Sequence, residues 1–154
     1  MIKRILLLLI FVSTISCGYE TKLSKKNENN YNFSLEEMVF EGDRVINLKI
    51  KEKLNNYRLN RKAKNFTLKI KSTNSKVVTG KNLEGDPTNF KNIATLYVNV
   101  LVENNVKNTL RFETSFNYYN NKNKFDLKKY EKNIKKNLAE TMANELIFKL
   151  SNIQ

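Results

Sequence analysis

Few residues in this 154-residue chain could do chemistry, and one of them, Cys17, stands apart. Cys17 is the only cysteine, and histidine is absent, so the chain lacks the commonest general base and metal ligand. It also contains no G-x-S-x-G motif, no glycine-rich phosphate loop and no cluster of acids at a metal-ligand spacing. We therefore expect no enzymatic activity, no metal and no cofactor, although Ser, Lys, Asp or Glu could still equip a small hydrolase.

The residues before Cys17 have the pattern of an export signal. Lys3 and Arg4 precede the unbroken apolar run Ile5–Val12, and small and polar residues follow it. The run is shorter than the about 20 apolar residues that a membrane-spanning helix needs. A small residue followed by Cys at the end of a signal resembles the lipobox of bacterial lipoproteins, whose cysteine is diacylated and becomes the first mature residue. This resemblance implies a lipoprotein signal peptide at residues 1–16.

Acylation would remove the one unpaired thiol of an exported chain. The alternative is an ordinary secreted protein with a reactive thiol at Cys17. Each buried CH₂ contributes about 0.8 kcal/mol, so two or three acyl chains on Cys17 would hold the protein on a membrane. Gly18 rather than Asp follows Cys17, which, by resemblance to the sorting rules of such lipoproteins, favours the outer membrane. The Lys-, Asn- and Ser-rich composition of Thr21–Asn32 predicts that residues 17–32 form a lipidated flexible tether.

The predicted mature chain, Cys17–Gln154, is strongly basic, with 26 bases against 15 acids and a net charge of +11. Such a surplus favours an anionic partner such as acidic lipid or phosphate. It could also reflect composition alone, because 23 of the 28 bases are Lys and Asn is abundant, as AT-rich coding would give. The export signal argues against a nucleic-acid partner. We therefore expect an anionic lipid environment and no nucleic acid.

Hydrophobic patterns divide residues 33–154 into the strands and helices of one domain. The expected strands are 33–41, with a bulge near Glu36-Glu37, and 65–72, 93–103 and 110–117; the expected helices are 44–57 and 127–150. Residues 76–81 are expected to continue a hairpin after a turn at 73–75, and Asn104-Asn105 to form the next tight turn. Asp43 and Asp126 are the expected N-caps, with Phe125 and Tyr130 as a hydrophobic staple around the second.

Every clear strand has one apolar and one polar face, and each helix has one apolar stripe. A sheet of such strands needs a cover on one side only, which the two helices supply. The predicted fold class is therefore α/β (α+β). It is a two-layer sandwich with a mostly antiparallel or mixed four-stranded sheet, covered on one face by two helices, in the order β-α-β-β-β-α.

Three segments and their order resemble the LPS-assembly lipoprotein family (LptE). They are Cys17-Gly18-Tyr19-Glu20, Gly85-Asp86-Pro87 before the long strand, and Phe116-Asn117-Tyr118-Tyr119-Asn120 before Phe125. The resemblance covers essentially the whole mature chain and implies an outer-membrane lipoprotein of Gram-negative cells. Members of the family bind and partly plug a large β-barrel translocon and help deliver lipopolysaccharide to the outer leaflet, without breaking a bond. The alternatives are a lipoprotein of similar fold that binds another envelope protein, and a small cell-envelope hydrolase.

The polar face of the predicted sheet is the candidate binding surface. A plug needs a polar outer surface because large barrels have polar interiors, although any two-layer domain shows such a face to water. On this face Lys69, Lys71 and Arg111 lie on neighbouring predicted strands and are the candidate site for lipid A phosphates. Phe148 lies off the helical stripe, since two steps rotate it by about 200°. It is the candidate contact with the partner barrel; the alternative is a second core face.

Overall fold

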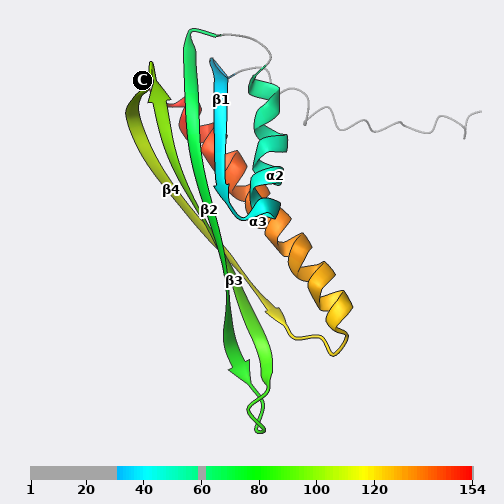
Figure 1. Cartoon of the computed structure of the whole chain (residues 1–154). Coiled ribbons are helices and arrows are strands. Elements are labelled where there is room, and N and C mark those ends of the chain that lie inside the picture. Colours follow the sequence, from blue (N-terminus) through cyan, green and yellow to red (C-terminus); the bar gives the residue numbers. More distant parts are fainter. Residues whose placement is uncertain (1–30, 59–61, 154) are drawn as a thin grey trace, which may run out of the picture. The chain divides into compact units, whose positions relative to one another are not determined.

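The computed structural model describes residues 31–58 and 62–153, a sheet with two helices packed on it (Figure 1). The elements are β1 Phe33–Gly42, α2 Arg44–Leu54, a 3₁₀ turn at Asn55–Tyr57, β2 Lys64–Lys81, β3 Pro87–Val102, β4 Asn105–Tyr119 and α3 Lys124–Ser151. This order confirms the predicted fold class. The predicted signal peptide, Cys17 and the predicted tether up to residue 30 lie outside the described residues. Within the described ranges, no helix is long and apolar enough to cross a membrane.

The sheet is mixed, with its strands in the order β1-β2-β3-β4. β1 runs parallel to β2, with α2 as the crossover between them, whereas β2, β3 and β4 are antiparallel neighbours. The pairing of β1 with β2 shifts register between Leu35 and Glu37, which confirms the predicted bulge. β1 ends at Gly42, opposite Ser72, and beyond that point β2 continues with β3 as its neighbour.

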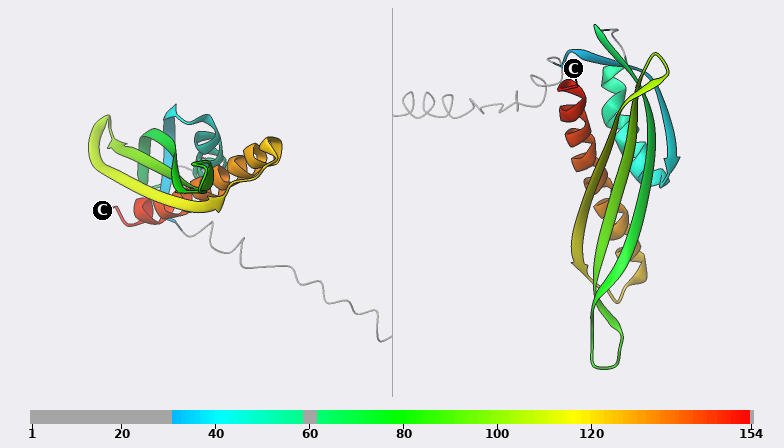
Figure 2. Two further views of the ribbon diagram at one scale, coloured as in Figure 1. Left: turned by 90° about the horizontal axis from the view of Figure 1, so that it is seen from below. Right: turned by 90° about the vertical axis from the view of Figure 1, so that its left-hand side faces the viewer.

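β2 and β3 form one long hairpin that extends past the ends of both helices (Figures 1 and 2). The predicted turn at 73–75 is therefore wrong, because β2 runs unbroken through these residues to Lys81. Each of the three residues pairs with a residue of β3. The side-chain amide of Asn74 also donates a hydrogen bond to the backbone oxygen of Ile93 at 3.2 Å. Cross-strand bonds thus hold a turn-favouring sequence extended.

The turns at both ends of β3 use asparagine. At 82–86 the side chain of Asn82 accepts hydrogen bonds from two backbone N–H groups of the turn, at 3.1 and 2.7 Å. Between β3 and β4, Glu103 and Asn104 have φ values of 49° and 66°, which are the left-handed values of a two-residue hairpin turn. The turn predicted at Asn104-Asn105 is therefore displaced by one residue, because Asn105 already pairs with β3.

The first helix, α2, begins directly after Asp43, which confirms Asp43 as its predicted N-cap. The Asp43 carboxylate accepts hydrogen bonds from the backbone N–H groups of Val45 and Ile46, at 2.9 and 3.1 Å. It also accepts one from Lys135 Nζ of α3, at 2.7 Å. Burial alone would raise the pKa of Asp43, but these hydrogen bonds outweigh it and hold the pKa below its usual value. Asp43 thus caps one helix and ties it to the other.

The N-cap of the last helix, α3, lies three residues before the predicted one. Asn123 is the N-cap, and its side-chain oxygen accepts from the backbone N–H groups of Phe125 and Asp126, at 3.0 and 3.4 Å. The predicted cap at Asp126 is wrong, because Asp126 lies inside the first turn of the helix. There its negative charge interacts favourably with the helix dipole. The predicted staple is also wrong, since Phe125 and Tyr130 are 74% and 47% exposed.

The core lies between the sheet and the two helices, which cover the same side (Figure 2). Its fully buried residues include Ile46, Ile50 and Leu54 of α2, Leu68, Leu96, Val98 and Val100 of the sheet, and Met142, Leu146 and Leu150 of α3. Lys53 and Glu140 join the two helices through an ion pair of 2.6 Å. Tyr31 packs against the rings of Phe33 and Tyr57, with centroid distances of 6.1 Å. The opposite side of the sheet carries no layer from the described part of the chain.

Candidate functional site: the open face of the sheet

The uncovered side of the sheet, which we call the open sheet face, is the candidate functional surface. Alternation along the strands places every second residue of β2, β3 and β4 on it. The rows across its middle are Glu41, Lys71, Tyr97 and Arg111; then Val39, Lys69, Asn99 and Thr109; then Thr73, Thr95 and Glu113. The structure therefore places Lys69, Lys71 and Arg111, the candidate phosphate-binding residues, on one surface.

Two of these three cations are paired with acids. Lys71 Nζ lies 3.2 Å from the carboxylate of Glu41 on β1, and Arg111 forms an ion pair with Glu113, two residues along β4. The Arg111 guanidinium also donates from Nε to the hydroxyl of Tyr97 at 3.3 Å, and lies over its ring. These exposed pairs contribute little to stability, but they neutralise charge within the face.

Lys69 remains available, because it has no ion-pair partner among the described residues. It lines a hollow of about 320 Å³ together with Lys71, Tyr97, Asn99 and, from β1, Val39 and Glu41, and the Glu41 carboxylate is paired with Lys71. The hollow combines one unpaired ammonium group, a phenol and an amide, which are all hydrogen-bond donors suited to an anionic oxygen. Binding of lipid A phosphates by Lys69, Lys71 and Arg111 stays a prediction.

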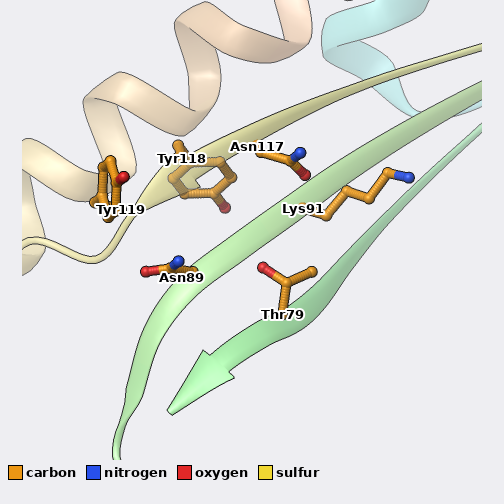
Figure 3. Close-up of a pocket in the computed structure, with 6 residues that line it drawn as sticks. All are labelled: Thr79, Asn89, Lys91, Asn117, Tyr118 and Tyr119. Atoms are coloured by element: carbon orange, nitrogen blue, oxygen red, sulfur yellow. The ribbon is translucent and has the colours of Figure 1, made fainter. Parts of the chain in front are cut away.

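A second hollow, of about 470 Å³, lies farther along the same face (Figure 3). Thr79 of β2, Asn89 and Lys91 of β3, and Asn117, Tyr118 and Tyr119 of β4 line it. Sequence reasoning missed this site because it began the third strand at residue 93. The alternation of polar residues before that point, Asn89 and Lys91, was the signal that could have revealed it.

A hydrogen-bonded brace supports this second hollow from the core side of the sheet. Glu131 of α3 accepts from Lys76 Nζ at 2.6 Å and from the hydroxyl of Tyr118 at 2.8 Å. Lys76 Nζ also lies 3.7 Å from the centre of the Phe90 ring. Burial raises the pKa of Glu131, but the bonds from Lys76 and Tyr118 outweigh it and lower the pKa overall. Burial, with the bond to Glu131, raises the pKa of Tyr118. The brace fixes the long hairpin to the start of α3.

Phe148, the candidate partner contact, is 60% exposed on α3. The alternative in which it forms a second core face is therefore wrong. Its neighbours Leu146, Ile147 and Leu150 provide the buried surface of that turn instead. Contact of Phe148 with a barrel stays a prediction.

The acids near the two hollows are engaged in ion pairs or hydrogen bonds. Glu41 and Glu113 pair with cations of the open sheet face, and Glu131 accepts the bonds of the brace. No group of three or more His, Cys, Asp or Glu residues in the described ranges could hold a metal ion. We expect that the protein is not an enzyme and needs no cofactor, and both statements stay predictions.

Solved structures of bacterial lipoproteins share this fold. Rare lipoprotein B from Shewanella oneidensis matches with a TM-score of 0.59 at 8% identity, over 75% of this chain and 93% of that one. A minor lipoprotein from Acinetobacter baumannii matches with a TM-score of 0.56 at 12% identity, over 75% and 90%. Lipoprotein B from Nitrosomonas europaea matches with a TM-score of 0.51 at 10% identity, over 80% and 87%. No protein-family model matches the chain, and no curated protein does. At these identities the likeness shows a common fold.

Proposed function

We propose that this protein is an outer-membrane lipoprotein that is acylated at Cys17 and binds a large β-barrel translocon of lipopolysaccharide. In this proposal the domain partly fills the barrel lumen and assists lipopolysaccharide assembly at the outer leaflet, without catalysis. The signal pattern that ends at Cys17 supports the anchor. The fold shared with bacterial lipoproteins and the resemblance to the LptE family support the role.

The observation that carries the proposal is the open sheet face. β3 has 16 residues, so three strands of about that length, about 3.3 Å per residue and about 4.8 Å apart, present about 750 Å². A specific protein interface buries about 800 Å² per partner. The face is polar, as the lumen wall of a large barrel is. Because its acids already neutralise Lys71 and Arg111, entry into the lumen would leave few charges without a partner.

In this proposal lipopolysaccharide would bind the open sheet face at its unpaired cations. Lys69 lies in the first hollow and Lys91 in the second, and neither has an ion-pair partner among the described residues. An ammonium group suits a phosphate as a point charge. We therefore place Lys69 first among the candidate contacts with lipid A phosphates, with Lys71 and Arg111 held in position beside it.

Affinity purification from outer membranes in mild detergent tests the partner. We expect near-equal recovery of a barrel of far larger mass, identified by mass spectrometry. Ser115→Arg, on the edge strand of the open sheet face, should lower this recovery about tenfold or more, because it adds bulk and a further charge to the contact. Thr141→Arg makes a matched change on the exposed side of α3 and should leave recovery unchanged. Recovery of the lipoprotein alone, or equal recovery by both variants, would contradict the proposed docking.

Replacement of Cys17 by Ser tests the anchor. We expect the variant to lose signal processing and retention in the outer membrane, because the acyl chains have no sulfur to join. Intact-mass analysis of the unchanged protein should find a chain that begins at an acylated Cys17. A chain that still begins at Met1, or that carries a free thiol, would contradict the lipoprotein assignment.

A further inference from the structure

We infer that the helix side of the domain docks on a bilayer of anionic phospholipid headgroups. The docking surface consists of the outer sides of α2 and the first half of α3, and we call it the basic helix face. Its members are Arg44 and Leu48 of α2, and Phe125, Lys129, Lys132 and Lys136 of α3. The helices and the open sheet face lie on opposite sides of the core, so this surface is distinct from the proposed barrel contact (Figure 2).

The two helices bring cations of separate segments together. Arg44, Lys132 and Lys136 line one hollow of about 550 Å³ together with Leu48, and the one acid in its lining, Glu52, is paired with Lys49. None of these three cations has an ion-pair partner among the described residues. Three unpaired charges within one hollow repel each other, and an anionic layer would relieve that repulsion.

The acids of the helix layer leave this charge uncompensated, because most of them already bind other lysines. The pairs are Glu52 with Lys49 at 3.0 Å, Glu140 with Lys53 at 2.6 Å, Asp43 with Lys135 at 2.7 Å, and Glu131 with Lys76 at 2.6 Å. The open sheet face differs, since Glu41 and Glu113 neutralise two of its cations. Unpaired positive charge is thus concentrated on the helix side.

Exposed apolar side chains lie among these cations. Leu48 is 57% exposed and Phe125 is 74% exposed. Phe125, Lys129, Lys132 and Lys136 follow at helical spacing and therefore share one stripe of α3. Lysines beside exposed leucine and aromatic side chains are typical of helices that lie in a membrane interface, where lysine stems extend toward the headgroups.

The predicted anchor does not fix which side of the domain contacts the bilayer. The positive charge of the basic helix face would determine that orientation. Cys17 precedes Tyr31 by 14 residues, a stretch of at most about 50 Å. That length would permit any side of the domain to meet the bilayer. Each Lys or Arg near an anionic surface favours docking by about fivefold, so three favour it by about a hundredfold. The effect would disappear at 1 M salt, where the Debye length is about 3 Å.

Fluorescence quenching on nanodiscs tests the docking with the full chain. One nanodisc contains phosphatidylglycerol and phosphatidylcholine, the other phosphatidylcholine alone, and both carry a headgroup quencher. A fluorophore at Asn133→Cys reports on α3, and one at Ser115→Cys reports on the open sheet face; the chain without an added cysteine gives the background. We expect stronger quenching at Asn133→Cys on anionic than on neutral nanodiscs, and no such difference at Ser115→Cys.

Charge variants decide whether the basic helix face is responsible. The triple variant Arg44→Gln, Lys132→Gln, Lys136→Gln should lose the difference between the two nanodiscs. The matched triple variant Lys81→Gln, Lys107→Gln, Lys149→Gln, whose lysines lie outside the basic helix face and outside both hollows of the open sheet face, should keep it. Equal quenching on both nanodiscs, or a difference that survives the first triple variant, would overturn the inference. If an acidic protein were the true occupant of this surface, quenching would be equal on the two nanodiscs, and the inference would be overturned in the same way. Copurification with the neutral nanodisc reports the acyl anchor separately, and failure to bind either nanodisc also overturns the docking.

Discussion

We expect a side chain at Gly42 to destabilise the fold, and the variant Gly42→Ala measures by how much. Gly42 ends β1 with φ at +100°, and a Cβ there would lie 1.9 Å from the backbone oxygen of Ser72. The same oxygen accepts the hydrogen bond of the Asp43 backbone N–H at 3.2 Å, just before α2 begins. The strained φ costs about 1–3 kcal/mol, and the disturbed hydrogen bond about 1 kcal/mol. Displacement of β1 from β2 adds to this, so we expect a loss of about 3–4 kcal/mol in the free energy of unfolding. For a domain of this size, that lowers Tm by about 10–15 °C.

Gly85→Ala is the matched control. Gly85 also has a positive φ, +89°, but no atom lies within 4 Å of the position its Cβ would take. It therefore carries the conformational cost without the clash. Urea unfolding of both variants, followed by circular dichroism, should give a loss that is larger for Gly42→Ala by at least about 1–2 kcal/mol. Equal losses would refute the argument that the close approach of β1 to Ser72 requires glycine.

The same unfolding assay checks the brace, the core and the helix cap. Glu131→Gln breaks the partly exposed pair with Lys76 and should cost about 1 kcal/mol at pH 7. Because folding lowers the Glu131 pKa from its ordinary value of 4.5, this contribution is present above that value and is lost as pH falls through the folded pKa, so the difference should shrink at pH 3; a constant difference would contradict the brace. Leu96→Ala removes a fully buried side chain and should cost about 2–5 kcal/mol; a cost below about 1 kcal/mol would place Leu96 outside the core. Asn123→Ala should cost about 1 kcal/mol and Asp126→Ala less, whereas the reverse order would restore Asp126 as the cap.

Alternation and helical spacing were sufficient to predict the order of elements and the covered side of the sheet. The lengths of the strands were not predictable in the same way. Thr73, Asn74 and Ser75 favour turns locally, but pairing with β3 holds them extended. The start of α3 shows the same limit, because Asn123 and Asp126 are both good caps and only the backbone entering the helix chooses between them. Pairing with β3 decides the first case, and the backbone conformation before the helix decides the second; neither is contained in the local pattern.

The sequence predicts which face of the sheet carries the candidate site, but it does not predict which of its cations are paired with acids. Alternation placed Lys69 and Lys71 on one side of their strand. Whether Lys71 is free depends on the register of β1, since the bulge after Leu35 brings Glu41 opposite Lys71. The basic helix face shows the converse. Helical spacing alone places Lys129, Lys132 and Lys136 on one stripe of α3, but only the packing of α2 on α3 brings Arg44 beside Lys132.

The two surfaces are compatible because the core separates them. A domain docked through the basic helix face would direct the open sheet face away from the bilayer and leave it free for a partner (Figure 2). The proposed docking would be a sum of individually weak and salt-sensitive contacts, each about fivefold in equilibrium constant. It would therefore hold an orientation without preventing release, and a barrel that offers an interface of standard size could displace it. Unpaired charge on the helices and mostly paired charge on the sheet would then act in sequence. The first would orient the anchored domain, and the second would allow it to bind its partner.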